Sequence, residues 1–168
     1  MDKAREEFQD IYNQNIDQVY RFVYLKVGSK EIAEDLTAEA FTKAWNVFKD
    51  RYDKKNKISN PKAFCYKTAR NSVIDYYRRN SLRRIVPIDS VAIKSKEDLQ
   101  EKMAINSDLK QVLDAMKSIK DDYQNIIIWR YLDELSIGEI SDIINKSEGA
   151  TRVMVHRAME SLRNVLES

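Results

Sequence analysis

The chain has 168 residues, 43% of them hydrophobic, which is enough apolar material for one medium domain or two small ones. Its 29 basic and 27 acidic residues leave a net charge of only +2, so a nucleic-acid site would require local segregation of charge. Three glycines, two prolines and the lack of alternating runs of Val, Ile and Thr argue against a sheet-based nucleotide fold and predict a nearly all-helical protein.

The N-terminal stretch and the cysteine content indicate the cellular compartment. The stretch MDKAREEFQD is charged and lacks the apolar core of a signal peptide, and no run of about 18 apolar residues occurs. We therefore expect a soluble, cytoplasmic protein without membrane insertion. Cys65 is the only cysteine, which excludes an internal disulfide and a cysteine-based zinc site, and its place between Phe64 and Tyr66 predicts a small packed residue.

Two core helices are predicted in the first 50 residues. Apolar residues recur at helical spacing from Phe8 to Val23, and Gly28 is a natural C-terminal cap. A second helix begins near Ser29, and its apolar stripe consists of Leu36, Ala40, Ala44, Val47 and Phe48. The opposite side carries a polar row, consisting of Asp35, Glu39, Thr42 and Asn46. A row of this kind is more often a solvated face than a binding site, and both interpretations stay open at this point.

A basic loop and a basic-aromatic helix follow. The loop, KDRYDKKNKISN at residues 49–60, is polar and rich in turn formers. Asn60-Pro61 then starts a helix, because proline fits the first helical turn, where its missing N–H costs nothing. Residues 60–84 contain seven basic residues and Asp75 as the only acid. Cations among aromatic rings suit single-stranded nucleic acid, although a solvated basic face is an equally common use of such a helix.

The predicted basic-aromatic helix has two different sides. Its packing side consists of Tyr66, Ala69, Val73 and Tyr77, and its outward side includes Lys67, Asn71 and Arg78. Beyond it the periodicity fades, and Pro87 and scattered serines predict an interdomain linker at residues 81–104. We therefore expect an all-α protein with one domain at residues 1–80 and a second at residues 105–168.

The second domain is predicted to end in a helix-turn-helix. After one helical pattern from Leu109 and another over about residues 121–132, a short helix begins with a capping box formed by Ser136 and Glu139. Asn145 suits the turn that follows, since asparagine tolerates the left-handed conformation, and Ser147 caps the last helix. Two packed helices without any role in DNA binding would give the same pattern.

The last helix also has two different sides. Its inner side consists of Thr151, Val155, Ala158 and Leu162, and its outer side offers Arg152, His156, Arg157 and Arg163. A helix inserted in the major groove contacts bases through its first turns, so Glu148, Thr151 and Arg152 are expected to touch base edges. Arg157 lies farther along the helix and is expected to meet phosphate.

Three segments together resemble the extracytoplasmic-function sigma factors, the compact two-domain branch of the sigma-70 family of bacterial promoter-recognition subunits. Residues 33–45, AEDLTAEAFTKAW, are similar to the helix with which members of the family bind the clamp helices of the largest RNA polymerase subunit. Residues 60–79, NPKAFCYKTARNSVIDYYRR, resemble the helix that opens and holds the minus-10 element. Residues 139–162 resemble the helix-turn-helix that reads the minus-35 element, with Gly149, His156-Arg157-Ala158 and Leu162 matching the family pattern.

The resemblance implies a non-enzymatic sigma factor that recognises both promoter elements and promotes DNA melting, without a metal or another cofactor. Its implied partners are core RNA polymerase, promoter DNA (duplex at minus-35, single-stranded at minus-10) and an anti-sigma factor. The implied polymerase-binding residues are Asp35, Leu36, Glu39, Thr42 and Asn46. The implied minus-10 residues are Arg51, Tyr52, Asn56, Lys57, Lys67, Arg70, Asn71, Arg78 and Arg79, with Tyr52 and Asn56 as candidates to receive a flipped base. The minus-35 residues are Ser147, Glu148, Thr151, Arg152, His156 and Arg157.

Two other functions compete with this interpretation. A helix-turn-helix transcriptional regulator that does not bind polymerase would explain the C-terminal half, but it leaves the polar row and the basic-aromatic helix without a function. A helical phosphohydrolase would hold Mg²⁺ with carboxylates, here Glu31, Glu34, Asp35 and Glu39. Glu34 points away from the Asp35/Glu39 row, and no second acidic cluster of similar density is evident to complete that site.

Overall fold

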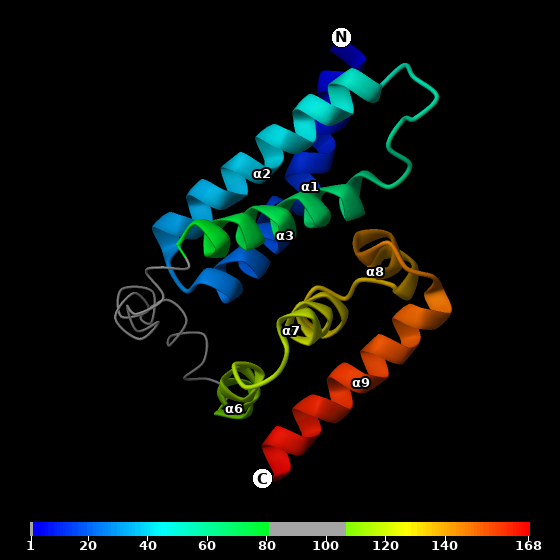
Figure 1. Cartoon of the computed structure of the whole chain (residues 1–168). Coiled ribbons are helices and arrows are strands. Elements are labelled where there is room, and N and C mark those ends of the chain that lie inside the picture. The colour runs from blue at the N-terminus through cyan, green and yellow to red at the C-terminus, as the bar shows by residue number, and fades with distance from the viewer. Residues whose placement is uncertain (1, 81–106) are drawn as a thin grey trace. The chain divides into compact units, whose positions relative to one another are not determined.

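The computed structural model describes residues 2–80 and 107–168, and every regular element within these residues is a helix (Figure 1). The chain divides into two compact units, residues 1–94 and 95–168. The prediction of an all-helical protein is therefore confirmed. The predicted linker at residues 81–104 lies outside the described residues, so the domain bounds drawn from it stay a prediction. No helix in the described parts combines the length and apolar character needed to cross a bilayer.

Three helices form the first unit: α1 (Asp2–Val27), α2 (Lys30–Arg51) and α3 (Pro61–Arg79). Each packs against the other two, and α1 and α2 run side by side in opposite directions (Figure 1). The reversal between them occurs at Gly28, whose φ of 71° is a left-handed conformation that glycine adopts without strain. The Ser29 hydroxyl then accepts a hydrogen bond from the Ile32 N–H at 3.4 Å and caps α2.

The core of the first unit is built from the apolar faces that the sequence predicts. On α2, Leu36, Ala40, Ala44 and Phe48 are buried, while Val47 is half-buried. Tyr66 of α3 is fully buried; its ring lies 6.2 Å from that of Phe22, and its hydroxyl donates to Oε1 of Gln18 at 3.3 Å. The hydroxyl of Tyr77 donates to the carbonyl of Lys26. Aromatic side chains of α3 thus join α3 to α1.

Cys65 is packed as predicted, with 3% of its surface exposed, and burial raises the pKa of its thiol to about 12. Because the thiolate is the nucleophile, the native chain is expected to react with an aromatic disulfide reagent at about pH 8 at least about 100-fold more slowly than the denatured chain. Absorbance of the released thiol measures both rates. Similar rates in native and denatured protein would contradict this packing.

The second unit contains α6 (Ser107–Met116), α7 (Asp121–Ile127), a π-helical turn η2 (Ile128–Leu132), α8 (Ile137–Ile144) and α9 (Glu148–Glu167). The helix predicted over residues 121–132 therefore changes to π geometry at Ile128, where the N–H of Asp133 donates to the Ile128 carbonyl at 2.9 Å. Residues 125–129 are all buried. This segment is enclosed on all sides, which a one-sided helical pattern does not predict.

The predicted turn chemistry of the helix-turn-helix is confirmed. Ser136 and Glu139 exchange two hydrogen bonds of 3.0 Å, which form the capping box of α8. Asn145 ends α8 in the left-handed conformation, with φ 56° and ψ 50°. The Ser147 hydroxyl accepts from the Ala150 N–H at 3.1 Å and caps α9. Helices α8 and α9 pack against each other, so this geometry fixes where α9 begins.

Candidate functional site

The polar row of α2 lies together on one exposed face. Asp35, Thr42 and Asn46 are exposed, and Glu39 forms an ion pair with Lys43 at 2.7 Å. This pair is partly exposed, so it contributes at most about 1 kcal/mol to stability. The face is available to a partner without unpacking the helix.

Leu36 is a correction to the predicted polymerase-binding set. Its side chain is 4% exposed, because it belongs to the apolar stripe that packs α2 into the core. Its side chain therefore packs in the core, away from the exposed polar row of α2, and it offers no surface to a partner. The other four members of that set share the exposed side of the helix.

The loop after α2 places Tyr52 and Lys57 in contact. The Lys57 ammonium lies 4.4 Å from the centroid of the Tyr52 ring. The Tyr52 hydroxyl donates to Oε1 of Glu7 on α1 at 2.7 Å, and this hydrogen bond is the main cause that raises the pKa of Tyr52. Arg51 and Asn56 are exposed. The base of the loop is thus tied to α1 while its cations face solvent.

Helix α3 divides its two sides as predicted. Tyr66, Ala69 and Val73 are buried, whereas the predicted DNA-binding residues of α3 keep solvent access. Of these, Asn71, Arg78 and Arg79 are exposed, and Lys67 and Arg70 are half-buried. The Arg79 Nε donates to the Asp75 carbonyl at 3.4 Å. Arg78 and Arg79 thus face solvent at the end of the helix, whereas the Nε of Arg70 is buried.

The outer side of α9 carries the predicted minus-35 residues Ser147, Glu148, Arg152, His156 and Arg157, all of them exposed. Arg152 pairs with Glu148 at 3.7 Å, with side chains 63% and 58% exposed. An ion pair as exposed as this contributes little to stability. Either side chain can therefore leave this ion pair and contact a base edge instead, at a low cost in free energy.

Thr151 is a second correction. It is fully buried, and its hydroxyl donates to the Ser147 carbonyl at 2.8 Å, so it cannot touch a base. Val153, which is outside the predicted minus-35 set, is instead 47% exposed beside Arg152. Helix phase alone could have found it, because the inner side of α9 leaves position 153 facing outward.

Carboxylates do not assemble into a metal site in the described parts of the chain. Within residues 2–80 and 107–168, no three His, Cys, Asp or Glu side chains come together in a way that could hold a metal ion. The magnesium site considered for Glu31, Glu34, Asp35 and Glu39 is therefore not formed there.

Comparison with known proteins gives matches for both units. The family description Sigma-70 region 2 matches residues 11–83, and Sigma-70, region 4 matches residues 109–162. The chain is 30% identical to the ECF RNA polymerase sigma factor SigM of Bacillus subtilis, over 92% of this chain and 91% of that protein. It is 28% identical to the ECF RNA polymerase sigma factor BldN of Streptomyces coelicolor over 96% of this chain, but it spans only 61% of the length of that relative.

A solved structure shares the fold. The sigma factor RpoE from Bartonella quintana, in complex with the anti-sigma factor NepR, gives a TM-score of 0.64 at 19% identity, covering 96% of this chain and 98% of that chain. The region 2 match also accounts for α2 and α3, which a plain helix-turn-helix regulator leaves unexplained. On these matches the chain belongs to the extracytoplasmic-function sigma factors of the sigma-70 family, the non-catalytic RNA polymerase subunits that recognise promoters and initiate transcription.

Proposed function

We propose that three surfaces of this chain divide the work of a sigma factor in the cytoplasm. The polar row of α2 binds core RNA polymerase, the loop after α2 and the outward side of α3 hold the unpaired minus-10 strand, and the first turns of α9 read the minus-35 duplex. The observation that carries this proposal is that α2, α3 and α9 each have one buried side and one exposed side, and the exposed sides carry the proposed contact residues.

The minus-10 surface fits single-stranded DNA by its chemistry. The Lys57 ammonium lies over the Tyr52 ring, where a base could take its place, and α3 adds Asn71, Arg78 and Arg79. Bases stack on aromatic rings while cations follow the phosphates, and this combination tolerates an extended, unpaired strand. A base extruded from the duplex loses a few kcal/mol of stacking and pairing, which contacts at Tyr52 and Asn56 would offset.

The minus-35 surface fits duplex DNA. Glu148 can accept from a cytosine amino group and Arg152 can donate to guanine through two hydrogen bonds. Val153 adds an exposed apolar side chain suited to the methyl group of thymine. His156 and Arg157 lie one turn farther along, where a helix in the groove approaches phosphate.

An anti-sigma factor is proposed as the regulatory partner. The support is that RpoE from Bartonella quintana, which shares the fold, forms a complex with the anti-sigma factor NepR. Copurification with the tagged full chain from its own cells would identify such a partner.

Run-off transcription tests the proposed function directly. Purified full-length chain is added to core polymerase on a library of genomic promoter fragments, and the transcripts are sequenced. We expect a set of transcripts that core polymerase alone does not make, with shared minus-10 and minus-35 elements upstream of their start sites. Duplex binding without any new transcript would favour a regulator that does not act as a polymerase subunit.

Arg78→Ala combined with Arg79→Ala is expected to impair promoter melting. Each lost phosphate contact lowers the log-log slope of affinity against salt by about 0.7 to 0.9, so the double variant should lower it by about 1.4 to 1.8. Permanganate footprinting on a linear promoter measures the melting. Lys3→Ala with Lys30→Ala removes two exposed cations elsewhere and serves as the matched control. If both double variants behave like the parent at every salt concentration, the two arginines are only solvated.

A further inference from the structure

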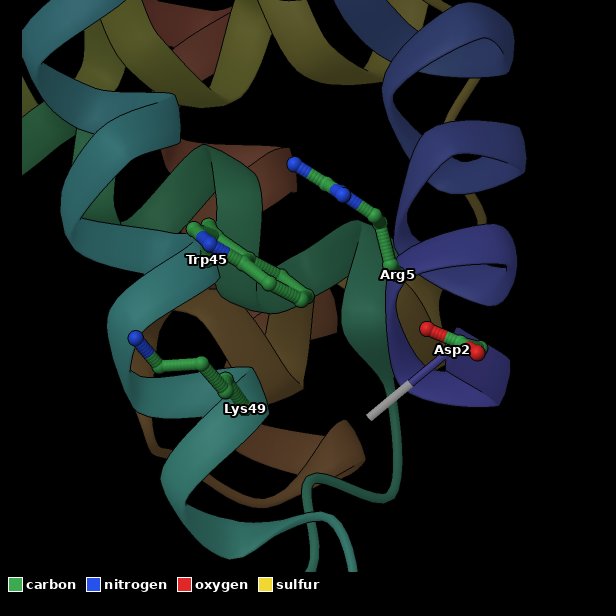
Figure 2. A pocket seen from close by; sticks show the side chains of 4 residues that line it. All are labelled: Asp2, Arg5, Trp45 and Lys49. Atoms are coloured by element: carbon green, nitrogen blue, oxygen red, sulfur yellow. The ribbon is translucent and has the colours of Figure 1, made fainter.

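A hollow of about 350 Å³ lies between the start of α1 and the end of α2, outside the surfaces assigned above. Figure 2 shows Trp45 and Lys49 of α2 on one side of it and Asp2 and Arg5 of α1 on the other. The lining thus combines an indole, two cations and one carboxylate. The antiparallel pairing of α1 and α2 brings these residues together, although more than forty positions separate Arg5 from Lys49 in the sequence.

The indole of Trp45 is a fixed, partly exposed ring. It packs against Phe8 at 5.4 Å between ring centroids, and the Lys49 ammonium lies 5.8 Å from its centroid. Trp45 is half-buried, so part of the ring reaches the hollow, while Arg5 is exposed on the facing helix. The Lys49 ammonium lies over the Trp45 ring, and Arg5 extends from the facing helix. A base that takes the place of the ammonium over the ring can stack there while both cations contact phosphate, so the hollow suits a nucleotide.

A row of three packed rings at the end of α2 links the wall of the hollow to Tyr52, the residue proposed to receive a flipped base. The rings of Trp45 and Phe48 lie 6.5 Å apart, and those of Phe48 and Tyr52 lie 5.7 Å apart. Phe48 is 3% exposed, so it joins two rings that each keep solvent access. Two helical turns separate Trp45 from Tyr52, about 10.5 Å along the axis. An unpaired strand extends farther per nucleotide than the stacked spacing of about 3.4 Å, so this distance corresponds to at most about three nucleotides.

We infer that this hollow binds a second unpaired nucleotide of the promoter strand whose first captured base lies at Tyr52. The base stacks on Trp45, and Arg5 and Lys49 contact the phosphates on either side of it. The inference rests on the proposed function, since it requires an unpaired strand at Tyr52. It commits to nucleic acid as the occupant because the lining carries a net positive charge and continues an aromatic row that already suits bases.

Fluorescence of 2-aminopurine tests the inference in open complexes formed by core polymerase with the full-length chain. The probe replaces one base at a time in and around the minus-10 element of the non-template strand, and stacking quenches it. We expect Trp45→Leu to relieve quenching at one position, which lies within about three nucleotides of the position relieved by Tyr52→Leu. Trp45→Phe keeps a ring and should retain most of the quenching. Loss of one base stack should also lower the open-complex equilibrium constant by about 5-fold to 150-fold.

A second pair of variants keeps the Trp45 ring and its packing against Phe8. Arg5→Ala with Lys49→Ala should shorten the lifetime of open complexes and reduce quenching at the Trp45-dependent position. Arg21→Ala with Lys30→Ala removes the same residue types from the same two helices at their other ends, and it should leave both measurements unchanged. If Trp45→Leu loses its helical circular dichroism, the Arg5/Lys49 variant decides the question by itself.

The outcomes separate this inference from the proposed function. If the parent chain makes no run-off transcript with core polymerase, the proposed function fails. If transcripts form but no probe position depends on Trp45, and Arg5/Lys49 open complexes live as long as those of the parent, the second nucleotide site does not exist. If the Arg5/Lys49 variant loses only a protein partner, the occupant is protein and the inference is overturned.

Discussion

Reversal of two acidic charges on α2 is expected to separate this chain from RNA polymerase. Asp35→Lys with Glu39→Lys should raise the Kd for core polymerase by at least about 30-fold, because complementary charges across an interface become like charges and cost about 2 kcal/mol or more. The fold should persist, since the row lies on the exposed face of α2 and the Glu39–Lys43 pair that the reversal breaks is partly exposed. Fluorescence anisotropy with labelled chain measures the affinity.

The first unit provides a matched control for this experiment. Glu6 and Asp10 on α1 are also exposed acids four residues apart, and Glu6→Lys with Asp10→Lys makes the same change of charge on a different face. This control should bind polymerase within about 3-fold of the parent if the contact is local to α2. Equal loss of affinity in both double variants would show that overall charge, and not the α2 row, determines binding. Unchanged affinity for the α2 variant with native circular dichroism would contradict the assigned face.

Two arginines of α9 are expected to act differently on DNA. Arg152→Ala should relax the preference at one or two adjacent minus-35 positions by about 5-fold to 150-fold, since a bidentate contact to guanine discriminates by about 1 to 3 kcal/mol. Arg157→Ala should weaken binding about equally for all sequences and lower the salt slope by about 0.9. Selection of binding sites from a randomised minus-35 box, performed with each variant, measures the preferences.

The ion pair between Arg152 and Glu148 gives this experiment a second arm. Because the two side chains form an ion pair at 3.7 Å, removal of Arg152 also leaves the Glu148 carboxylate without this partner. Glu148→Gln alone should change the preference at a different position, where a cytosine amino group would be read. Arg163→Ala, on the same side of α9 but three turns beyond Arg152, should leave the preference unchanged. Identical preferences for the parent and Arg152→Ala would refute the base contact.

Local chemistry made the helix boundaries of this chain readable from sequence. Gly28, Ser29 and Ser147 are residues whose backbone or side-chain preferences act within one turn, and each ends or starts a helix as predicted. The apolar stripe of α2 and the buried side of α3 follow from helical spacing in the same way. Helix caps and helical spacing depend only on residues close together in the chain, so both can be predicted from the sequence.

Two kinds of feature could not be read with the same success. The predicted binding sets include Leu36 and Thr151, although helical spacing places both residues on buried sides. The π turn at Ile128 and the hollow at Trp45 depend on contacts between distant segments. Periodicity describes one helix at a time, so it gives no account of an enclosed segment or of a space shared by two helices.

The start of α9 is held by a compact set of bonds that bears on the entropy of DNA binding. The Ser147 hydroxyl accepts from the Ala150 N–H, and the Ser147 carbonyl accepts from both the N–H and the hydroxyl of Thr151, at 2.9 and 2.8 Å. The backbone that carries Glu148 and Arg152 is therefore ordered before DNA arrives. Binding then has to immobilise only side chains, each at about 0.5 to 1.5 kcal/mol, and no helix needs to form in the groove. A preorganised first turn therefore leaves more of the contact energy as net affinity for the duplex.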